Sequence, residues 1–134
     1  MGTLLTVVVA IVGGLFAVMA LMQVLVRLRA KAQTGKPVPS LPGPLGKHVS
    51  KGRRALVYFH SPGCAACRTF TPQLQELSRK NPMVHLVDVS RDLETAQALK
   101  VMATPSFVEI DEGKVTGFHV GPAPAEVMAR YAAT

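Results

Sequence analysis

A pair of cysteines, Cys64 and Cys67, constrains this chain more than any other feature, and they are the only two among its 134 residues. The apolar run from Ala55 to His60 ends just before them and predicts a buried strand, and a helical pattern begins at the second cysteine. A helix N-terminus presents free N–H groups and the positive end of the helix dipole, and both favour a thiolate over a thiol. Two cysteines cannot form a disulfide framework, so this spacing indicates a redox pair or a metal-binding pair.

The segment of residues 3–26 is apolar throughout, and its only strongly polar side chain is Gln23. As a helix, its roughly 24 residues would extend about 36 Å, enough to cross a hydrocarbon core of about 30 Å. A cleavable signal peptide is the alternative, but the segment is longer than such a region and no Lys or Arg precedes it. We therefore predict an uncleaved, single-pass membrane anchor within residues 1–31.

The orientation of this anchor follows from the basic residues that flank it. None precedes the span, and four follow it, at Arg27, Arg29, Lys31 and Lys36. The positive-inside rule then predicts that the rest of the chain faces the cytoplasm from the cell (inner) membrane. The alternative is that these residues only anchor the helix in the headgroups, with the domain on the periplasmic or extracellular side.

The net charge of +7 favours contact with a membrane surface as a partner. Only 5% of the residues are aromatic and none is Trp, and no basic stripe is interleaved with aromatic side chains. Stacking on bases is therefore poorly supported, and we expect no nucleic-acid partner.

Two further segments follow the anchor. Residues 32–52 are rich in proline and glycine, which predicts a stiff, extended linker whose later part replaces a first strand and which holds the domain away from the bilayer. Residues 53–134 predict an α/β domain with a mixed sheet, in which the first two strands are parallel and the last two form a hairpin. The expected strands cover residues 55–60, 83–89, 106–110 and 115–120, and the expected helices cover residues 67–80, 93–100 and those after Pro124.

This order of elements and several motifs resemble the thioredoxin family. Gly63-Cys64-Ala65-Ala66-Cys67 after a strand resembles the family's strand-to-helix redox motif, and Pro72 matches its kinking proline. Thr104-Pro105, before a later strand, is similar to its cis-proline loop. The resemblance covers roughly residues 55–134 and implies a short version of the thioredoxin-like three-layer α/β/α sandwich.

The resemblance also implies a chemistry. Cys64 would be the attacking thiolate, and Cys67 would resolve the mixed disulfide that Cys64 forms with a substrate. Thr104 and Pro105 would bind the substrate strand. The implied partners are protein thiols and disulfides together with an upstream redox protein, and the only redox group is the Cys64–Cys67 disulfide, with no cofactor and no metal.

The residues around the motif depart from common thioredoxins. Gly63 replaces a Trp, Ala65-Ala66 replaces Gly-Pro, and Tyr58 stands where the family has a buried Asp. His60, four residues before Cys64, could tune the thiolate or could be an ordinary surface residue at the end of a strand. His48, His85 and His119 are isolated in the sequence and receive no role.

Two hypotheses follow. The first is a membrane-tethered thiol–disulfide oxidoreductase that exchanges disulfides with protein substrates, in either direction of electron flow. The alternative is a membrane-anchored binding module with the same fold, or a metal or iron–sulfur carrier. Such a carrier would need a site shared between two chains, because zinc prefers four ligands and the sequence has one cysteine pair.

Overall fold

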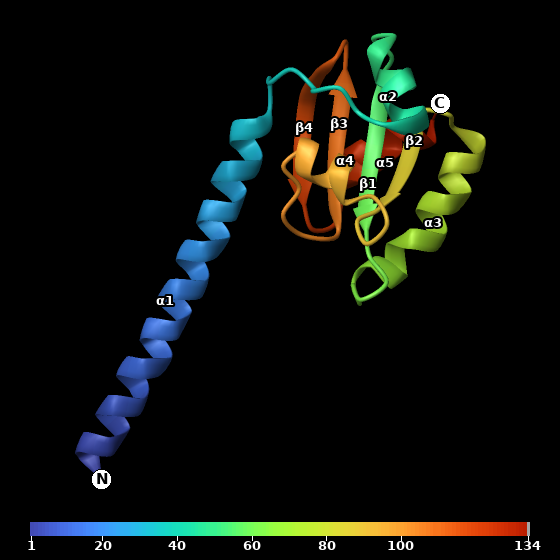
Figure 1. The fold of residues 1–134 in the computed structure, drawn as a ribbon. Coiled ribbons are helices and arrows are strands. Elements are labelled where there is room, and N and C mark those ends of the chain that lie inside the picture. The colour runs from blue at the N-terminus through green and yellow to red at the C-terminus, as the bar shows by residue number, and fades with distance from the viewer. Residues whose placement is uncertain (134) are drawn as a thin grey trace.

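A computed structural model describes residues 1–133 as a long N-terminal helix and an α/β domain beside its C-terminal end (Figure 1). The helix α1 (Gly2–Gln33) is long and apolar enough to cross a membrane. The remaining elements, in chain order, are α2 (Gly43–Ser50), β1 (Ala55–His60), α3 (Cys67–Lys80), β2 (Val84–Asp88), α4 (Leu93–Ala98), β3 (Ser106–Asp111), β4 (Lys114–Val120) and α5 (Ala125–Ala132). From β1 onward this is the order that the sequence predicts.

The four strands form one mixed sheet in the order β2-β1-β3-β4. β1 pairs with β2 in parallel, with His60 opposite Asp88, and pairs with β3 antiparallel. β3 and β4 form the predicted hairpin, which turns through Glu112 and Gly113, both with positive φ. The parallel pair and the hairpin are therefore both confirmed.

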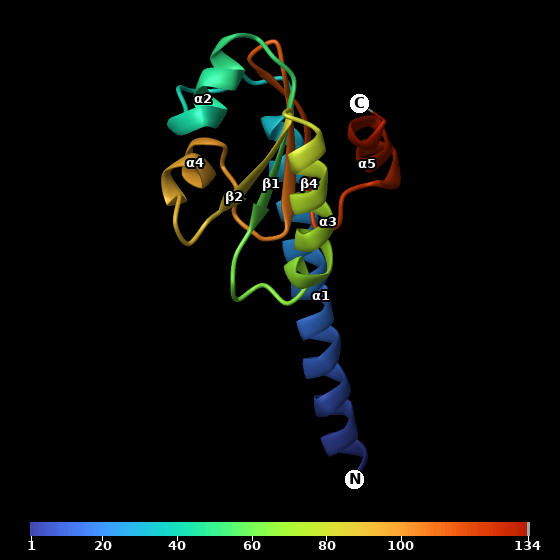
Figure 2. The same cartoon turned by 90° about the vertical axis from the view of Figure 1, so that its right-hand side faces the viewer.

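Helices cover both faces of the sheet, which confirms the three-layer arrangement (Figure 2). α2 and α4 lie on one face, over a buried cluster that includes Val57, Phe59 and Val108. α3 and α5 lie on the other face, over a cluster that includes Tyr58 and Phe107. Neighbouring β1 residues belong to opposite clusters because successive side chains of a strand point to opposite faces.

The segment of residues 32–52 differs from the extended linker that its composition predicts, because its second half is the helix α2. Two prolines fit this helix: Pro42 is its N-cap residue and Pro44 lies in its first turn, where the missing N–H costs no hydrogen bond. Leu45 and Val49, four residues apart, are both buried against the sheet. Gly46 is needed because a Cβ there would overlap the carbonyl oxygen of Leu41.

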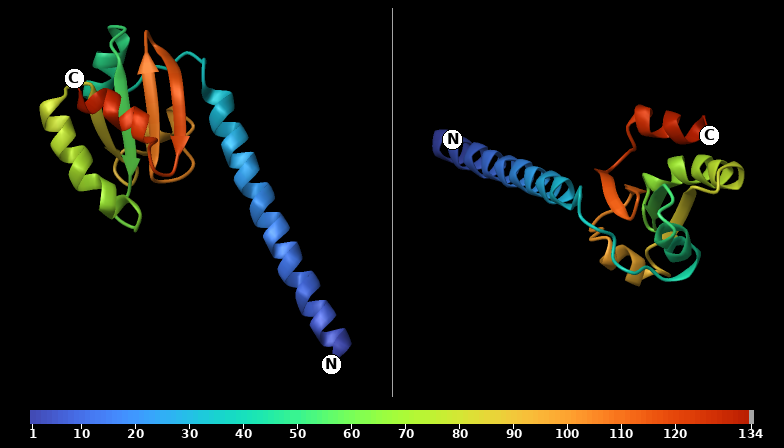
Figure 3. Two further views of the ribbon diagram at one scale, coloured as in Figure 1. Left: turned by 180° about the vertical axis from the view of Figure 1, so that it is seen from behind. Right: turned by 90° about the horizontal axis from the view of Figure 1, so that it is seen from above.

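The first half of this segment pairs with β4, so it is attached to the domain and is not the free extended linker that its composition predicts. The N–H of Gly35 donates to the carbonyl of Val115 at 2.6 Å, and the N–H of Val115 donates to Lys36 at 3.0 Å. Ala30, in the last turns of α1, is buried at 8% exposure. α1 thus leaves the domain directly at the β4 edge of the sheet (Figure 3).

The helix α4 is shorter than expected, and its first residue, Leu93, is exposed to solvent. Asp92 caps it as predicted, because its carboxylate accepts the N–H of Thr95 at 3.0 Å. Ala96 and Leu99 are buried, but Leu93 is 58% exposed and does not belong to the apolar face assigned to it. The helix ends at Ala98, and Lys100 turns the chain with a φ of 58°.

His85 on β2 gives a prediction for stability against pH. Its Nε2 is buried and receives no hydrogen bond from residues 1–133, and its ring lies edge-on to His48 with centroids 5.0 Å apart. Burial, and secondarily the charge of His48, lowers the pKa of His85 from its usual 6.5. Below about pH 6.5, His85 therefore binds a proton more readily in the unfolded chain than in the folded chain, and acidification favours unfolding.

We expect the thermal midpoint of the full chain in detergent micelles to fall between pH 7.5 and pH 5.5. The variant His85→Phe should show a smaller fall, because it keeps a ring at this position and cannot take up a proton. Above pH 7, His85 is neutral in both the folded and the unfolded chain, so it no longer contributes to the pH dependence of stability. An equal fall in both proteins would assign the pH dependence to other groups.

Candidate functional site

The turn between β1 and α3 holds the cysteine pair. β1 ends at His60, and the N–H of Cys64 donates to the carbonyl of Ser61 at 3.2 Å, which folds the chain back toward α3. Cys64 and Cys67 form a disulfide with their Cα atoms 5.3 Å apart. Cys64 is half-exposed, whereas Cys67 is 2% exposed. One sulfur can thus meet a partner protein and the other is sheltered.

The first turn of α3 supplies a hydrogen bond to the outer sulfur. The N–H of Cys67, the first residue of the helix, donates to Sγ of Cys64 at 3.2 Å. An N–H at this position has no acceptor within the helix and lies at the positive end of the helix dipole. The same hydrogen bond would stabilise negative charge on Cys64 once the disulfide is reduced.

The loop before β3 lies beside this turn. The peptide bond between Thr104 and Pro105 is cis. The hydroxyl groups of Ser61 and Thr104 are 3.3 Å apart, which joins two segments separated by 43 residues. The carbonyl of Pro105 accepts the N–H of Gly121 at 2.8 Å, and Gly121 has a φ of 91°, which favours glycine. The cysteine motif and the predicted cis-proline loop therefore come together in space.

Tyr58 lies beneath the cysteine turn, on the α3 face of the sheet. Its hydroxyl donates to the carbonyl of Cys67 at 3.3 Å and also contacts the hydroxyl of Thr71 at 3.0 Å. Its ring stacks on Phe107, with centroids 4.9 Å apart. Burial raises the pKa of Tyr58, so the hydroxyl stays protonated and serves as a structural support of α3.

A cavity of about 360 Å³ opens beside the sheltered sulfur. Its lining includes Cys67, His60 and Asp88, together with Thr71 and Pro72 of α3. His60 stacks on Tyr58, with ring centroids 5.3 Å apart. The hydroxyl and the N–H of Ser90 both donate to the Asp88 carboxylate, and these bonds lower the pKa of Asp88. A histidine and a carboxylate that remains ionised thus share the cavity with Cys67.

The family model named Thioredoxin matches residues 45–134, which is most of the chain. The chain belongs to the thioredoxin family. Among curated relatives, the thioredoxin H-type of Fagopyrum esculentum is 34% identical over 88 residues, covering 64% of this chain and 76% of that relative. The thioredoxin of Bacillus subtilis (strain 168) is 30% identical over 76 residues, covering 54% of this chain and 73% of that one.

Solved thioredoxins have the same fold. The crystal structure of Schistosoma mansoni thioredoxin aligns with a TM-score of 0.57 and 32% identity, covering 66% of this chain and 85% of that one. The structure of Fasciola hepatica thioredoxin aligns with a TM-score of 0.55 and 29% identity, covering 66% and 89%. With its disulfide-bonded cysteine pair, this member of the thioredoxin family is a thiol–disulfide oxidoreductase.

The remaining residues predicted from the sequence lie around this turn in different ways. Gly63 is exposed, and a Cβ there would meet only open space, so position 63 contributes no side chain that could cover the neighbouring Cys64. Pro72 lies inside α3 and lines the cavity beside Cys67. Within residues 1–133, no group of three His, Cys, Asp or Glu side chains could hold a metal ion.

Sequence reasoning missed three contributors to this site: Asp88, Ser61 and Thr71. Asp88 had a usable signal, because His60 ends one of two strands predicted to be parallel and Asp88 lies next to the predicted end of the other, and such ends meet at one edge of a sheet. The hydroxyl contacts of Ser61 and Thr71 had no such signal, since each depends on the exact placement of a loop or helix.

The cavity predicts a role for His60 in the second chemical step. Cys67 must lose its proton before it can attack, and general-base catalysis by a positioned side chain contributes about 10²- to 10⁴-fold. We expect His60→Gln to slow the release of substrate from the mixed disulfide by about tenfold or more. Formation of the mixed disulfide by Cys64 should change much less. Rapid-quench kinetics that separate the two steps would check this.

The matched control is His48→Gln, because His48 lies on α2 and the amide can replace its hydrogen bond to the carbonyl of Arg54. It should leave both steps unchanged. If His60→Gln slows both steps equally, His60 acts on the fold and not on the proton of Cys67.

Proposed function

We propose that this protein is a membrane-tethered thiol–disulfide oxidoreductase that works through the Cys64-Ala65-Ala66-Cys67 dithiol. The observation that carries the proposal is the pairing of an N–H of α3 with Sγ of Cys64, beside a cis Thr104–Pro105 loop. This arrangement favours a thiolate at the more exposed of the two sulfurs.

In the proposed reaction, the Cys64 thiolate attacks one sulfur of a substrate disulfide and displaces the other as a thiolate. Cys67 then loses its proton and attacks Sγ of Cys64, which releases the second substrate thiolate and closes the Cys64–Cys67 disulfide. The substrate gains two electrons and the enzyme loses two. An upstream dithiol protein restores the reduced enzyme, and no cofactor or metal takes part. The reverse sequence oxidises a substrate dithiol.

Thr104 and Pro105 are proposed to hold the substrate. The side chain of Thr104 is half-exposed next to the cysteine turn, whereas Pro105 is buried and has no N–H to donate. An extended substrate segment could pair with the exposed backbone of this loop and place its sulfur near Cys64. The open space at Gly63 leaves room for a bulky residue of the substrate.

The tether is proposed to be α1, retained in the mature protein. A helix of this length and composition can be a membrane span or a signal sequence. Retention is supported by the packing of Ala30 on the domain and by the backbone bonds of Gly35 and Val38 to the β3–β4 hairpin. Cleavage near residue 30 would remove buried surface from the folded domain.

The proposed cytoplasmic side can be tested by thiol labelling in intact cells. After treatment with a membrane-permeant reductant, an impermeant maleimide should modify Cys64 only once the membrane is permeabilised. The basic residues after the span are the reason for this expectation. Modification without permeabilisation would place the domain on the outer side.

The activity itself is tested with the full chain in lipid vesicles, supplied with dithiothreitol and insulin. Thiol-dependent reduction of insulin that disappears in Cys64→Ser is the expected result. If insulin and small disulfides are not reduced at all, the alternative of a non-catalytic binding module or metal carrier replaces the enzyme.

A further inference from the structure

The membrane helix is joined to the domain without a flexible hinge. Three backbone hydrogen bonds fasten the segment that follows α1 to the hairpin: Gly35 N–H to Val115 at 2.6 Å, Val38 N–H to Gly113 at 2.8 Å, and Val115 N–H to Lys36 at 3.0 Å. Ala30 is buried one turn before the end of α1. The direction of α1 therefore sets the orientation of the whole domain.

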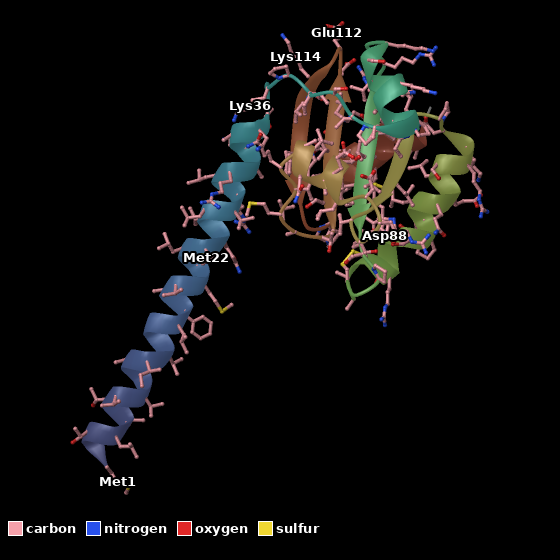
Figure 4. All side chains as sticks on the ribbon, in the orientation of Figure 1. Met1, Met22, Lys36, Asp88, Glu112 and Lys114 are labelled. Atoms are coloured by element: carbon pink, nitrogen blue, oxygen red, sulfur yellow. A yellow bond between two sulfur atoms is a disulfide. The ribbon has the colours of Figure 1, made fainter. Side chains whose placement is uncertain are left out.

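The end of the domain that carries Cys64 and Cys67 faces in the same direction as the N-terminal, membrane-spanning part of α1. In Figure 4, Lys36, Glu112 and Lys114 lie at the end of the domain far from Met1, whereas Asp88 and the yellow disulfide lie at the opposite end. β4 runs back along α1, so that Val120 at its end lines a groove with Met22 and Val26.

The length of the span places this end of the domain at the bilayer surface. A hydrocarbon core of about 30 Å needs about 20 helical residues, which the stretch from Thr3 to Met22 provides. A groove of about 380 Å³ between α1 and the domain is lined by Met22 and Val26 on one side and by Met102 and Ala103 on the other. The loop that leads into Thr104–Pro105 thus lies level with the end of the span.

The side chains at this end suit an interface with lipid. Met102 is 74% exposed and Val120 is 38% exposed, although both are apolar. Basic side chains adjoin them, since Arg29 and Lys100 line the same groove. Apolar side chains that enter the headgroup layer, bordered by cations that meet phosphates, are the usual composition of a surface that rests on a membrane.

We propose that the dithiol end of the domain rests on the bilayer and that its substrates are disulfides or dithiols of integral membrane proteins, within a few residues of the membrane surface. This inference rests on the proposed function and on α1 crossing the membrane. Cysteines far from the bilayer would meet the opposite end of the domain, where Lys114 lies, and would react with Cys64 more slowly.

The orientation can be measured without any redox step, because the chain has no Trp. Met102→Trp in vesicles should be quenched about twofold when the acyl chains of the phosphatidylcholine are brominated, since the indole would lie at the acyl boundary. The matched control is Lys114→Trp, an exposed position at the other end of β4. It should show no quenching. Equal fluorescence of Met102→Trp in brominated and ordinary lipid would overturn the proposal.

The substrate class is tested with a transmembrane peptide that carries a fluorophore through a disulfide. In one version the disulfide lies two residues beyond the apolar span, and in the other it follows a Gly-Ser spacer of about 60 residues, which averages about 40 Å. The full chain in the same vesicles should reduce the near disulfide about tenfold faster, because geometry sets the effective concentration. Equal rates, or a preference for the distant disulfide, would contradict the proposal.

A variant with a 12-residue Gly-Ser insertion between Gln33 and Thr34 separates this inference from the proposed function. It frees the domain from the direction of α1 and should reduce both peptides at similar rates. Insulin, which is soluble, should be reduced by this variant at least as fast as by the wild type. Absence of insulin reduction in both proteins would refute the proposed function, whereas insulin reduction with no preference of the wild type for the near peptide would refute only the orientation.

Discussion

Replacement of Cys67 with serine is expected to leave Cys64 covalently joined to its substrate. Serine is close to cysteine in size but its hydroxyl does not attack a disulfide, so the second step stops and turnover should fall by about 10³-fold or more. The adduct should persist in the absence of added thiol, because no second cysteine of the chain remains to attack it. Non-reducing electrophoresis and mass spectrometry of the full chain in vesicles would detect it.

The matched variant Cys64→Ser should form no adduct, since the remaining thiol of Cys67 is sheltered by the turn. Its loss of turnover should be as large. Trapping through Cys67 in this variant, at a rate similar to that of Cys67→Ser, would mean that the roles of the two cysteines are reversed. Absence of an adduct in both variants would argue for the binding module.

Replacement of Tyr58 with alanine is expected to give the largest loss of stability among changes near the site. The side chain is fully buried, stacks on Phe107 and supports the first turn of α3 through the carbonyl of Cys67. Truncation of a buried aromatic residue costs about 3–5 kcal/mol. A small domain has little more than that in total, so a large fraction of the chain should be unfolded at 37 °C.

Urea unfolding of the full chain in micelles, followed by the circular dichroism of the domain, would measure this loss. The control Tyr58→Phe keeps the ring and removes the hydroxyl, and should cost about 1–2 kcal/mol. It should also speed proteolysis near the start of α3, because Thr71 and Cys67 lose a shared partner. If both variants were equally unstable, the hydroxyl contacts and not the ring would carry the stability.

The α/β part of the fold could be predicted because its signals are local. Each strand is a short apolar run bounded by turn residues, and α4 begins with an aspartate that caps it. α2 was missed for a different reason. Its helical spacing of Leu45 and Val49 is present, but the prolines around it also fit an extended linker, and only packing on the sheet decides between the two.

The cysteines and the Thr104–Pro105 pair could be predicted because a motif marks each of them. The buried carboxylate of Glu109 on β3 could not be predicted in this way. Glu109 is 6% exposed and pairs with Arg130 at 3.1 Å and with His119 at 3.2 Å. Gly117 lies opposite in the register, and a Cβ there would overlap the carboxylate. The arrangement joins three elements, so no single stretch of sequence contains it.

The attachment of α1 along β4 also hinders the pairing of this edge strand with strands of other copies of the chain. β4 is an edge strand, and an uncovered edge offers unpaired N–H and C=O groups to any neighbouring chain. Here residues 35–38 occupy the start of that edge, and the last turns of α1 lie beside the rest. In the proposed membrane-tethered form, identical copies would reach a high local density, which favours aggregation through uncovered strand edges. If α1 spans the membrane as proposed, the same helix that concentrates the molecules there would also cover the edge through which they could aggregate.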